Sequence, residues 1–91
     1  MDRQRRTVHF SGSVQGVVFR YTAARLAEGF DVAGYVRNLS DERVEIVVEG
    51  PLGQIEAFLQ ALRDRMGHYV DDVSEHVSAA TGEYGGFGVR L

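Results

Sequence analysis

An apolar stripe after Pro51 constrains the fold of this 91-residue chain more than any other sequence feature. Large apolar side chains recur at helical spacing on one face, at Ile55, Phe58, Leu59, Leu62 and Met66. Pro51 suits a helix start, where a missing N–H costs nothing, and Gly67 is typical of a helix end. We therefore predict a helix between Pro51 and Gly67, one face of which needs an apolar partner.

Short strands supply that apolar partner. Residues 7–14 alternate strictly between apolar and polar side chains, as a half-buried strand does. Segments 32–38 and 43–49 predict two more strands, and their short polar link predicts a hairpin. Residues 72–79 form a weaker alternating strand, and residues 84–91 hold a turn and a last short strand. The expected core face of the sheet consists of Val8, Phe10, Val14, Val44, Ile46 and Val48.

The order of these elements predicts the fold class. Residues 20–28, rich in Ala and Leu and followed by Gly29, predict a second helix. The order β-α-β-β-α-β, with a small strand added, is typical of the α+β class with a ferredoxin-like split β-α-β arrangement. Two helices then lie on one face of an antiparallel sheet. We expect residues 1–6 to be a flexible tail and residues 7–91 to form one domain.

Composition excludes several function classes. The chain has no cysteine, and its ten basic residues are all arginine. A disulfide framework, a P-loop lysine and Schiff-base chemistry are therefore excluded. The three histidines show no metal-ligand spacing, so we expect no metal and no cofactor. The formal net charge of -3 argues against nucleic-acid binding. With no transmembrane run and no signal peptide, we expect a cytoplasmic monomer with no membrane partner.

The junction between the first strand and the first helix is the first candidate site. Backbone N–H groups at a helix start attract anions, and Gly16 permits close approach of an anion. Arg20 adds a planar fork of donors suited to phosphate oxygens. This pattern favours a phosphate-binding loop made of Gln15, Gly16, Val17, Val18, Phe19 and Arg20. An ordinary strand–loop–helix junction with the same Gly and Arg is the alternative.

Asn38, at the end of the strand over 32–38, is the second candidate. Its amide both donates and accepts hydrogen bonds, so it can orient a water molecule. The alternative is a turn asparagine that bonds to its own backbone.

Together these two segments resemble the acylphosphatase family. Residues 12–20 match the family signature G-x-V-Q-G-V-x-F-R at every fixed position, and residues 34–38 match G-[WY]-V-x-N. The resemblance spans almost the whole chain. It implies a ferredoxin-like fold and hydrolysis of acyl phosphates to a carboxylate and inorganic phosphate. It also implies that Arg20 binds the phosphate and that Asn38 positions the attacking water.

Two segments depart from the family pattern. The family usually has Asp-Gly in the hairpin after the asparagine, where this chain has Asp41-Glu42. Because a glutamate resists the positive φ that glycine accepts, we expect a different turn and a small shift of Asn38. The family also carries Gly-Pro followed by Ala-x-Val before the fourth strand. Residues 67–73 differ from that pattern, and the difference bears on acyl-group specificity.

Two other functions remain open from the sequence. A non-catalytic ferredoxin-like module could bind a phosphorylated metabolite or a protein partner. An RNA-binding domain of similar topology is more distant, because the chain is acidic and lacks the aromatic motifs of such domains. The presence of both Arg20 and Asn38 favours the enzyme, with an acyl phosphate as substrate and inorganic phosphate as product.

Overall fold

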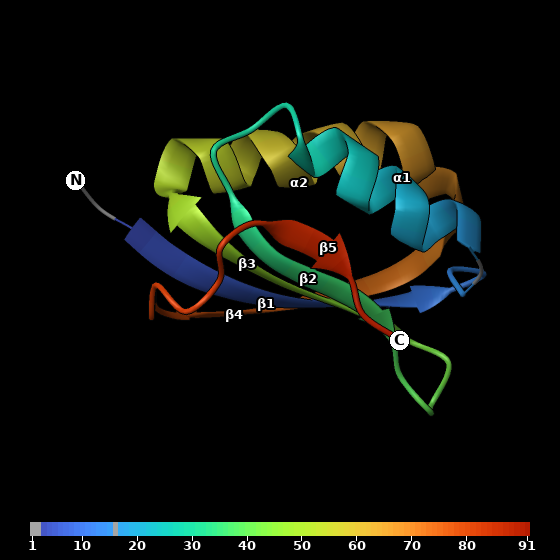
Figure 1. Cartoon of the computed structure of the whole chain (residues 1–91). Helices are drawn as coiled ribbons and strands as arrows, with labels where there is room; N and C mark the ends of the chain where they lie inside the picture. Colours follow the sequence, from blue (N-terminus) through green and yellow to red (C-terminus); the bar gives the residue numbers. More distant parts are fainter. Residues whose placement is uncertain (1–2, 16) are drawn as a thin grey trace.

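Two helices cover one face of a five-stranded sheet in a computed structural model that describes residues 3–15 and 17–91 (Figure 1). The elements in chain order are β1 (Arg3–Gly12), α1 (Val17–Ala27), β2 (Ala33–Asn38), β3 (Val44–Pro51), α2 (Leu52–Met66), the 3-10 turn η1 (Gly67–Tyr69), β4 (Val70–Ala79) and β5 (Phe87–Val89). No helix in the described part of the chain is long and apolar enough to cross a membrane.

The strand order in the sheet is β4-β1-β3-β2-β5. The first four strands pair antiparallel, and β5 pairs parallel to β2. The predicted ferredoxin-like α+β fold is confirmed. The expectation of a purely antiparallel sheet needs one correction at the edge, because β5 returns alongside β2 in the same direction and makes the sheet mixed.

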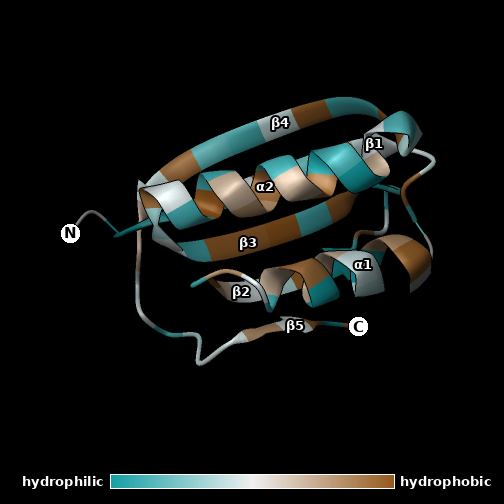
Figure 2. Ribbon diagram, turned by 90° about the horizontal axis from the view of Figure 1, so that it is seen from above, coloured by the Kyte–Doolittle hydropathy of each residue, from teal (hydrophilic) through white to brown (hydrophobic). Residues whose placement is uncertain are grey.

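The core lies between the helices and the sheet. All eleven residues expected there from the two apolar patterns are buried. Ring contacts join the layers, with centroids 5.4 Å apart between Phe10 and Phe19 and 5.3 Å apart between Phe58 and Phe87. The central strand β3 is apolar over most of its length (Figure 2), and its residues 44–50 are all buried. This central place explains why even Glu45 and Glu49 are buried.

Two predicted element starts were wrong by three or more residues, and the strand predicted over 7–14 ends at Gly12. Strand β1 begins at Arg3, so residues 3–6 belong to the sheet, whereas Met1 and Asp2 lie outside the described residues. Arg5 and Arg6 are held by Glu49 (Nε to Oε2, 2.7 Å) and by Glu75 (Nη1 to Oε1, 3.3 Å). Charge patterning alone did not identify these partners, which lie on β3 and β4.

Helix α1 begins at Val17, three residues earlier than predicted. Valine is a modest helix former, but Phe19 is buried against Phe10, and this tertiary packing outweighs the local propensity. The predicted phosphate loop is therefore shorter, and its residues from Val17 to Arg20 form the first turn of α1.

Candidate active site

The C-terminal ends of β1 and β2 lie at the same end of the sheet, on either side of β3. Both strands pair antiparallel with β3, so they run in the same direction. Val44 pairs with Phe10 on one side and with Asn38 on the other. With neighbouring strands about 4.8 Å apart, the backbones of Phe10 and Asn38 are roughly 10 Å apart across β3. The structure thus places the two predicted site segments at one end of the sheet.

Gln15 links these two segments. Its Nε2 donates to the carbonyl oxygen of Leu39 at 2.7 Å and to that of Arg43 at 3.0 Å. These carbonyls lie on the two sides of the β2–β3 hairpin. Leu39 directly follows Asn38, and Arg43 directly precedes β3. The side chain of Gln15 therefore contacts the hairpin, and only its backbone remains available to the predicted phosphate loop. Gly16 lies outside the described residues.

Arg20 and Asn38 both carry a buried polar atom that no described residue pairs with. Among the described residues, neither Nε of Arg20 nor Oδ1 of Asn38 has a hydrogen-bond partner. Leaving a buried polar group unpaired is unfavourable, and such groups are rare in folded proteins. The third atom of this kind, Nε of Arg6, differs because another nitrogen of that guanidinium contacts Glu75. Arg20 and Asn38 thus have donor and acceptor capacity left for a ligand.

The hairpin after Asn38 keeps the backbone shape that the sequence argued against. Glu42 has a φ of 75°, in the left-handed region that glycine usually occupies. The Arg43 N–H donates to Oδ1 of Asp41 at 3.2 Å, and Nε of Arg43 donates to Oδ2 at 2.8 Å. The N–H donated by Arg43 leads the interactions that lower the pKa of Asp41. The expectation that the turn would avoid a positive φ at glutamate was therefore wrong, because these local bonds hold the turn despite the cost of that conformation.

A buried carboxylate lies beside Asn38 in the sheet. Glu45 follows Val44, and its carboxylate accepts hydrogen bonds from Tyr35 (3.0 Å) and Arg37 (2.8 Å), while Nε2 of His9 lies at 2.9 Å. Burial raises the pKa of Glu45, but these three hydrogen bonds outweigh it, so the pKa lies below its ordinary value. Alternation in 43–49 placed Glu45 on the polar face of the sheet, but it did not indicate that three neighbours would bury it.

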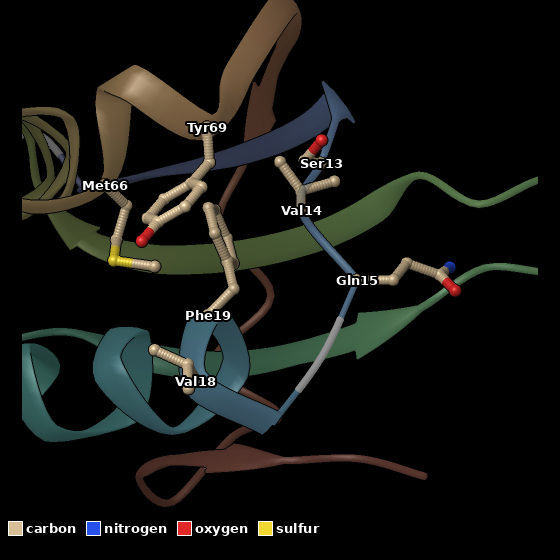
Figure 3. A pocket seen from close by; sticks show the side chains of 7 residues that line it. All are labelled: Ser13, Val14, Gln15, Val18, Phe19, Met66 and Tyr69. Carbon is tan, nitrogen blue, oxygen red and sulfur yellow. The ribbon is translucent and has the colours of Figure 1, made fainter.

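A cavity opens beside the predicted phosphate loop, between α1 and η1 (Figure 3). We call it the α1–η1 cavity. It has a volume of about 370 Å³ and is lined by Ser13, Val14, Gln15, Val18, Phe19, Met66 and Tyr69. In Figure 3 the amide of Gln15 extends away from the other six side chains. Residues 67–73 depart from the family pattern, but no local sequence pattern indicates this cavity.

Comparisons with known proteins agree over nearly the whole chain. The acylphosphatase family model matches residues 6–89. An acylphosphatase of Arthrobacter sp. (strain FB24) is 46% identical over 79 residues, which cover 86% of this chain and 72% of the relative. An acylphosphatase of Roseiflexus sp. (strain RS-1) is 39% identical over 90 residues, which cover 98% of this chain and 97% of the relative.

Solved structures give the same result. The crystal structure of acylphosphatase from Bacillus subtilis matches with a TM-score of 0.85 and 30% identity, over 97% of this chain and 99% of that one. A bacterial light-regulated adenylyl cyclase matches with a TM-score of 0.72 at only 5% identity, so that likeness concerns the fold alone. These relatives confirm the predicted family and enzyme class, and they give no support to the non-catalytic module. The chain belongs to the acylphosphatase family.

Proposed function

We propose that this chain hydrolyses acyl phosphates to a carboxylate and inorganic phosphate. The oxygen of water forms a bond to phosphorus, and the bond from phosphorus to the acyl oxygen breaks. The acyl oxygen leaves as a carboxylate and keeps the bonding electrons. The anhydride is intrinsically reactive and its leaving group is stable, so positioning and charge stabilisation can supply the catalysis.

The backbone N–H groups of residues 15–20 and the guanidinium of Arg20 bind the phosphoryl oxygens in this proposal. Unpaired N–H groups in the first turn of α1 favour an anion, and the planar fork of Arg20 matches two phosphate oxygens. Asn38 orients the attacking water in line with the leaving carboxylate. The proton of that water passes to a phosphoryl oxygen of the substrate.

One observation supports these roles. Nε of Arg20, in the first turn of α1, and Oδ1 of Asn38, in the segment that Gln15 joins to the loop, are buried without partners among the described residues. A phosphoryl group supplies acceptors for the guanidinium, and a water supplies a donor for the Asn38 oxygen. Bound substrate would therefore pair both atoms.

Metal independence is part of the proposal. The described residues include no group of three or more His, Asp or Glu side chains placed to hold a metal ion. The test is hydrolysis of acetyl phosphate by the full chain before and after exhaustive chelation. We expect the same turnover in both samples. Loss of hydrolysis on chelation, restored by adding a divalent ion, would contradict this part of the proposal.

A further inference from the structure

We propose that the α1–η1 cavity receives the acyl group of the substrate and selects uncharged, apolar acyl groups over small or charged ones. This inference rests on the proposed hydrolysis of acyl phosphates and adds a substrate class to it.

The cavity lies against both flanks of the proposed phosphate loop. Three lining residues, from Ser13 to Gln15, come before Gly16, and two others, Val18 and Phe19, belong to the first turn of α1. In a substrate whose phosphoryl group is held by this loop, the acyl carbon is attached through the bridging oxygen, two bonds from phosphorus. The α1–η1 cavity, which is bounded by these same residues, is therefore a space that this substituent can enter.

The lining is mostly apolar and carries no charged side chain. Val14, Phe19 and Met66 are buried, while Val18 and Tyr69 have exposed fractions of 64% and 43%. None of the seven lining residues is Asp, Glu, Arg or His. An apolar acyl chain would remove these side chains from water, which is favourable. An acyl group that carries a second carboxylate would lose hydration there without gaining a counter-charge.

Close backbone contacts hold the two walls of the cavity together. The N–H of Ser13 donates to the carbonyl oxygen of Tyr69 at 2.9 Å. Gly12 has a φ of 122°, and a Cβ built there would lie 2.6 Å from the same oxygen. Only glycine permits this approach of β1 to η1. The position of Tyr69 relative to the loop is therefore fixed by the backbone, as a preformed pocket requires.

The wall that carries Tyr69 comes from the divergent segment. Tyr69 lies within residues 67–73, which depart from the family pattern, and its ring packs on His68 with centroids 4.0 Å apart. Acyl preference is thus expected to be a property of this chain and of relatives with a bulky apolar residue at the position of Tyr69.

The first test measures kcat/KM of the full chain for acetyl, butyryl and succinyl phosphate. Each methylene that enters an apolar site is worth about 2- to 4-fold in affinity. We therefore expect butyryl phosphate to exceed acetyl phosphate by about 10-fold. Succinyl phosphate, which has the same number of carbons as butyryl phosphate but a second carboxylate, should fall below butyryl phosphate.

Two outcomes of this test have different meanings. Equal kcat/KM values for the three substrates would overturn the acyl-cavity inference and leave the proposed hydrolysis intact. Absence of hydrolysis for all three would contradict the proposed function, and the inference would fall with it.

The second test compares two exposed tyrosines. Tyr69→Ser removes a wall of the cavity, whereas Tyr21→Ser removes a tyrosine of α1 that is 56% exposed and does not line it. We expect the butyryl-to-acetyl ratio of kcat/KM to fall at least about 3-fold in Tyr69→Ser, the value of about one buried methylene or more. The ratio should not change in Tyr21→Ser. An unchanged ratio in Tyr69→Ser, or equal changes in both variants, would overturn the inference.

Discussion

Buried polar groups near the two ends of β3 differ in whether they have hydrogen-bond partners. Glu49 lies near one end and Val44, the pairing partner of Asn38, lies at the other, roughly 17 Å away along the strand. Glu49 is only 2% exposed, and its carboxylate accepts hydrogen bonds from Arg5, Thr81 and Gly82. At the Val44 end, Oδ1 of Asn38 has no partner among the described residues, and neither has Nε of Arg20, in the first turn of the helix that follows β1.

This difference in hydrogen bonding indicates that the Glu49 end contributes to stability and the Val44 end to function. The Glu49 end contains a closed network that ties the segment before β5 to the sheet, and it leaves no oxygen of the carboxylate for a ligand. The Val44 end leaves buried hydrogen-bonding capacity unused, which is unfavourable for folding alone. Such groups persist where a ligand supplies the missing partners. Substitutions at the two ends should therefore affect different measurements.

The largest expected effect is the loss of catalysis in Arg20→Ala and Arg20→Lys. Removing a preorganised donor to transition-state charge costs roughly 3–4 kcal/mol, or about 100- to 1,000-fold in kcat/KM. Lysine keeps the charge but not the paired donors. Because Nε of Arg20 has no partner to lose within the described residues, urea unfolding should change little. Near-normal turnover in Arg20→Lys would contradict a bidentate role.

A large loss of stability is expected at the Glu49 end, in Glu49→Gln. Burial raises the pKa of Glu49, but the N–H groups of Thr81 and Gly82 and the Arg5 guanidinium outweigh it and lower the pKa to about 2. The folded state therefore favours the charged form. The resulting stabilisation, about 3 kcal/mol, is complete above the ordinary pKa near 4.5 and is lost as the pH falls toward 2.

Urea unfolding at pH 7, 5 and 3 checks this prediction. The free energy of unfolding of the unsubstituted chain should fall toward acid pH, and Glu49→Gln should start lower and depend less on pH. Glu83→Gln is the matched control, because Glu83 also contacts Arg5 but is more than half exposed. It should cause a smaller loss. Parallel pH profiles for the unsubstituted chain and Glu49→Gln would rule out the closed network as the source of this stability.

A smaller effect on stability and turnover is expected in Gln15→Glu, where the phosphate loop contacts the β2–β3 hairpin. A carboxylate keeps the shape of the amide but cannot donate to the carbonyls of Leu39 and Arg43. We expect a loss of about 1–2 kcal/mol in unfolding free energy and a clear fall in turnover as the hairpin moves relative to the loop. Gln60→Glu, on the exposed face of α2, should leave turnover unchanged. Full turnover in Gln15→Glu would show that the hydrogen bonds of Gln15 to the hairpin are not needed for catalysis.

The smallest expected effect is a gain in stability in Glu42→Gly. A non-glycine residue in the left-handed region costs about 1 kcal/mol or slightly more, and glycine removes that cost while adding entropy to the unfolded chain. We expect a net gain of at most about 1 kcal/mol and unchanged turnover, because the turn already has the required shape. A large change in turnover would indicate that Glu42 affects Asn38.

Local patterns predicted the layers and the core, because alternation and helical periodicity report directly which side chains are buried. They did not predict the start of β1 at Arg3, whose partner Pro51 lies 48 positions along the chain. The motifs singled out Arg20 and Asn38. They did not indicate the hydrogen bonds from Gln15 to the hairpin, because these bonds form only when the fold brings the two segments together. The α1–η1 cavity likewise joins Ser13, Val14, Gln15, Val18 and Phe19 to Met66 and Tyr69. Contacts between distant segments leave no periodic signal in the sequence.

The most direct test of the central claim is the affinity for inorganic phosphate, titrated in the unsubstituted chain, Arg20→Ala and Asn38→Ala and set beside turnover. The account assigns the phosphate oxygens to the loop and Arg20, and the attacking water to Asn38. Arg20→Ala should therefore lose phosphate affinity and turnover together, whereas Asn38→Ala should lose turnover and keep nearly all its phosphate affinity. An Asn38→Ala variant that loses phosphate affinity as severely as Arg20→Ala, or that remains fully active, would contradict this division of roles.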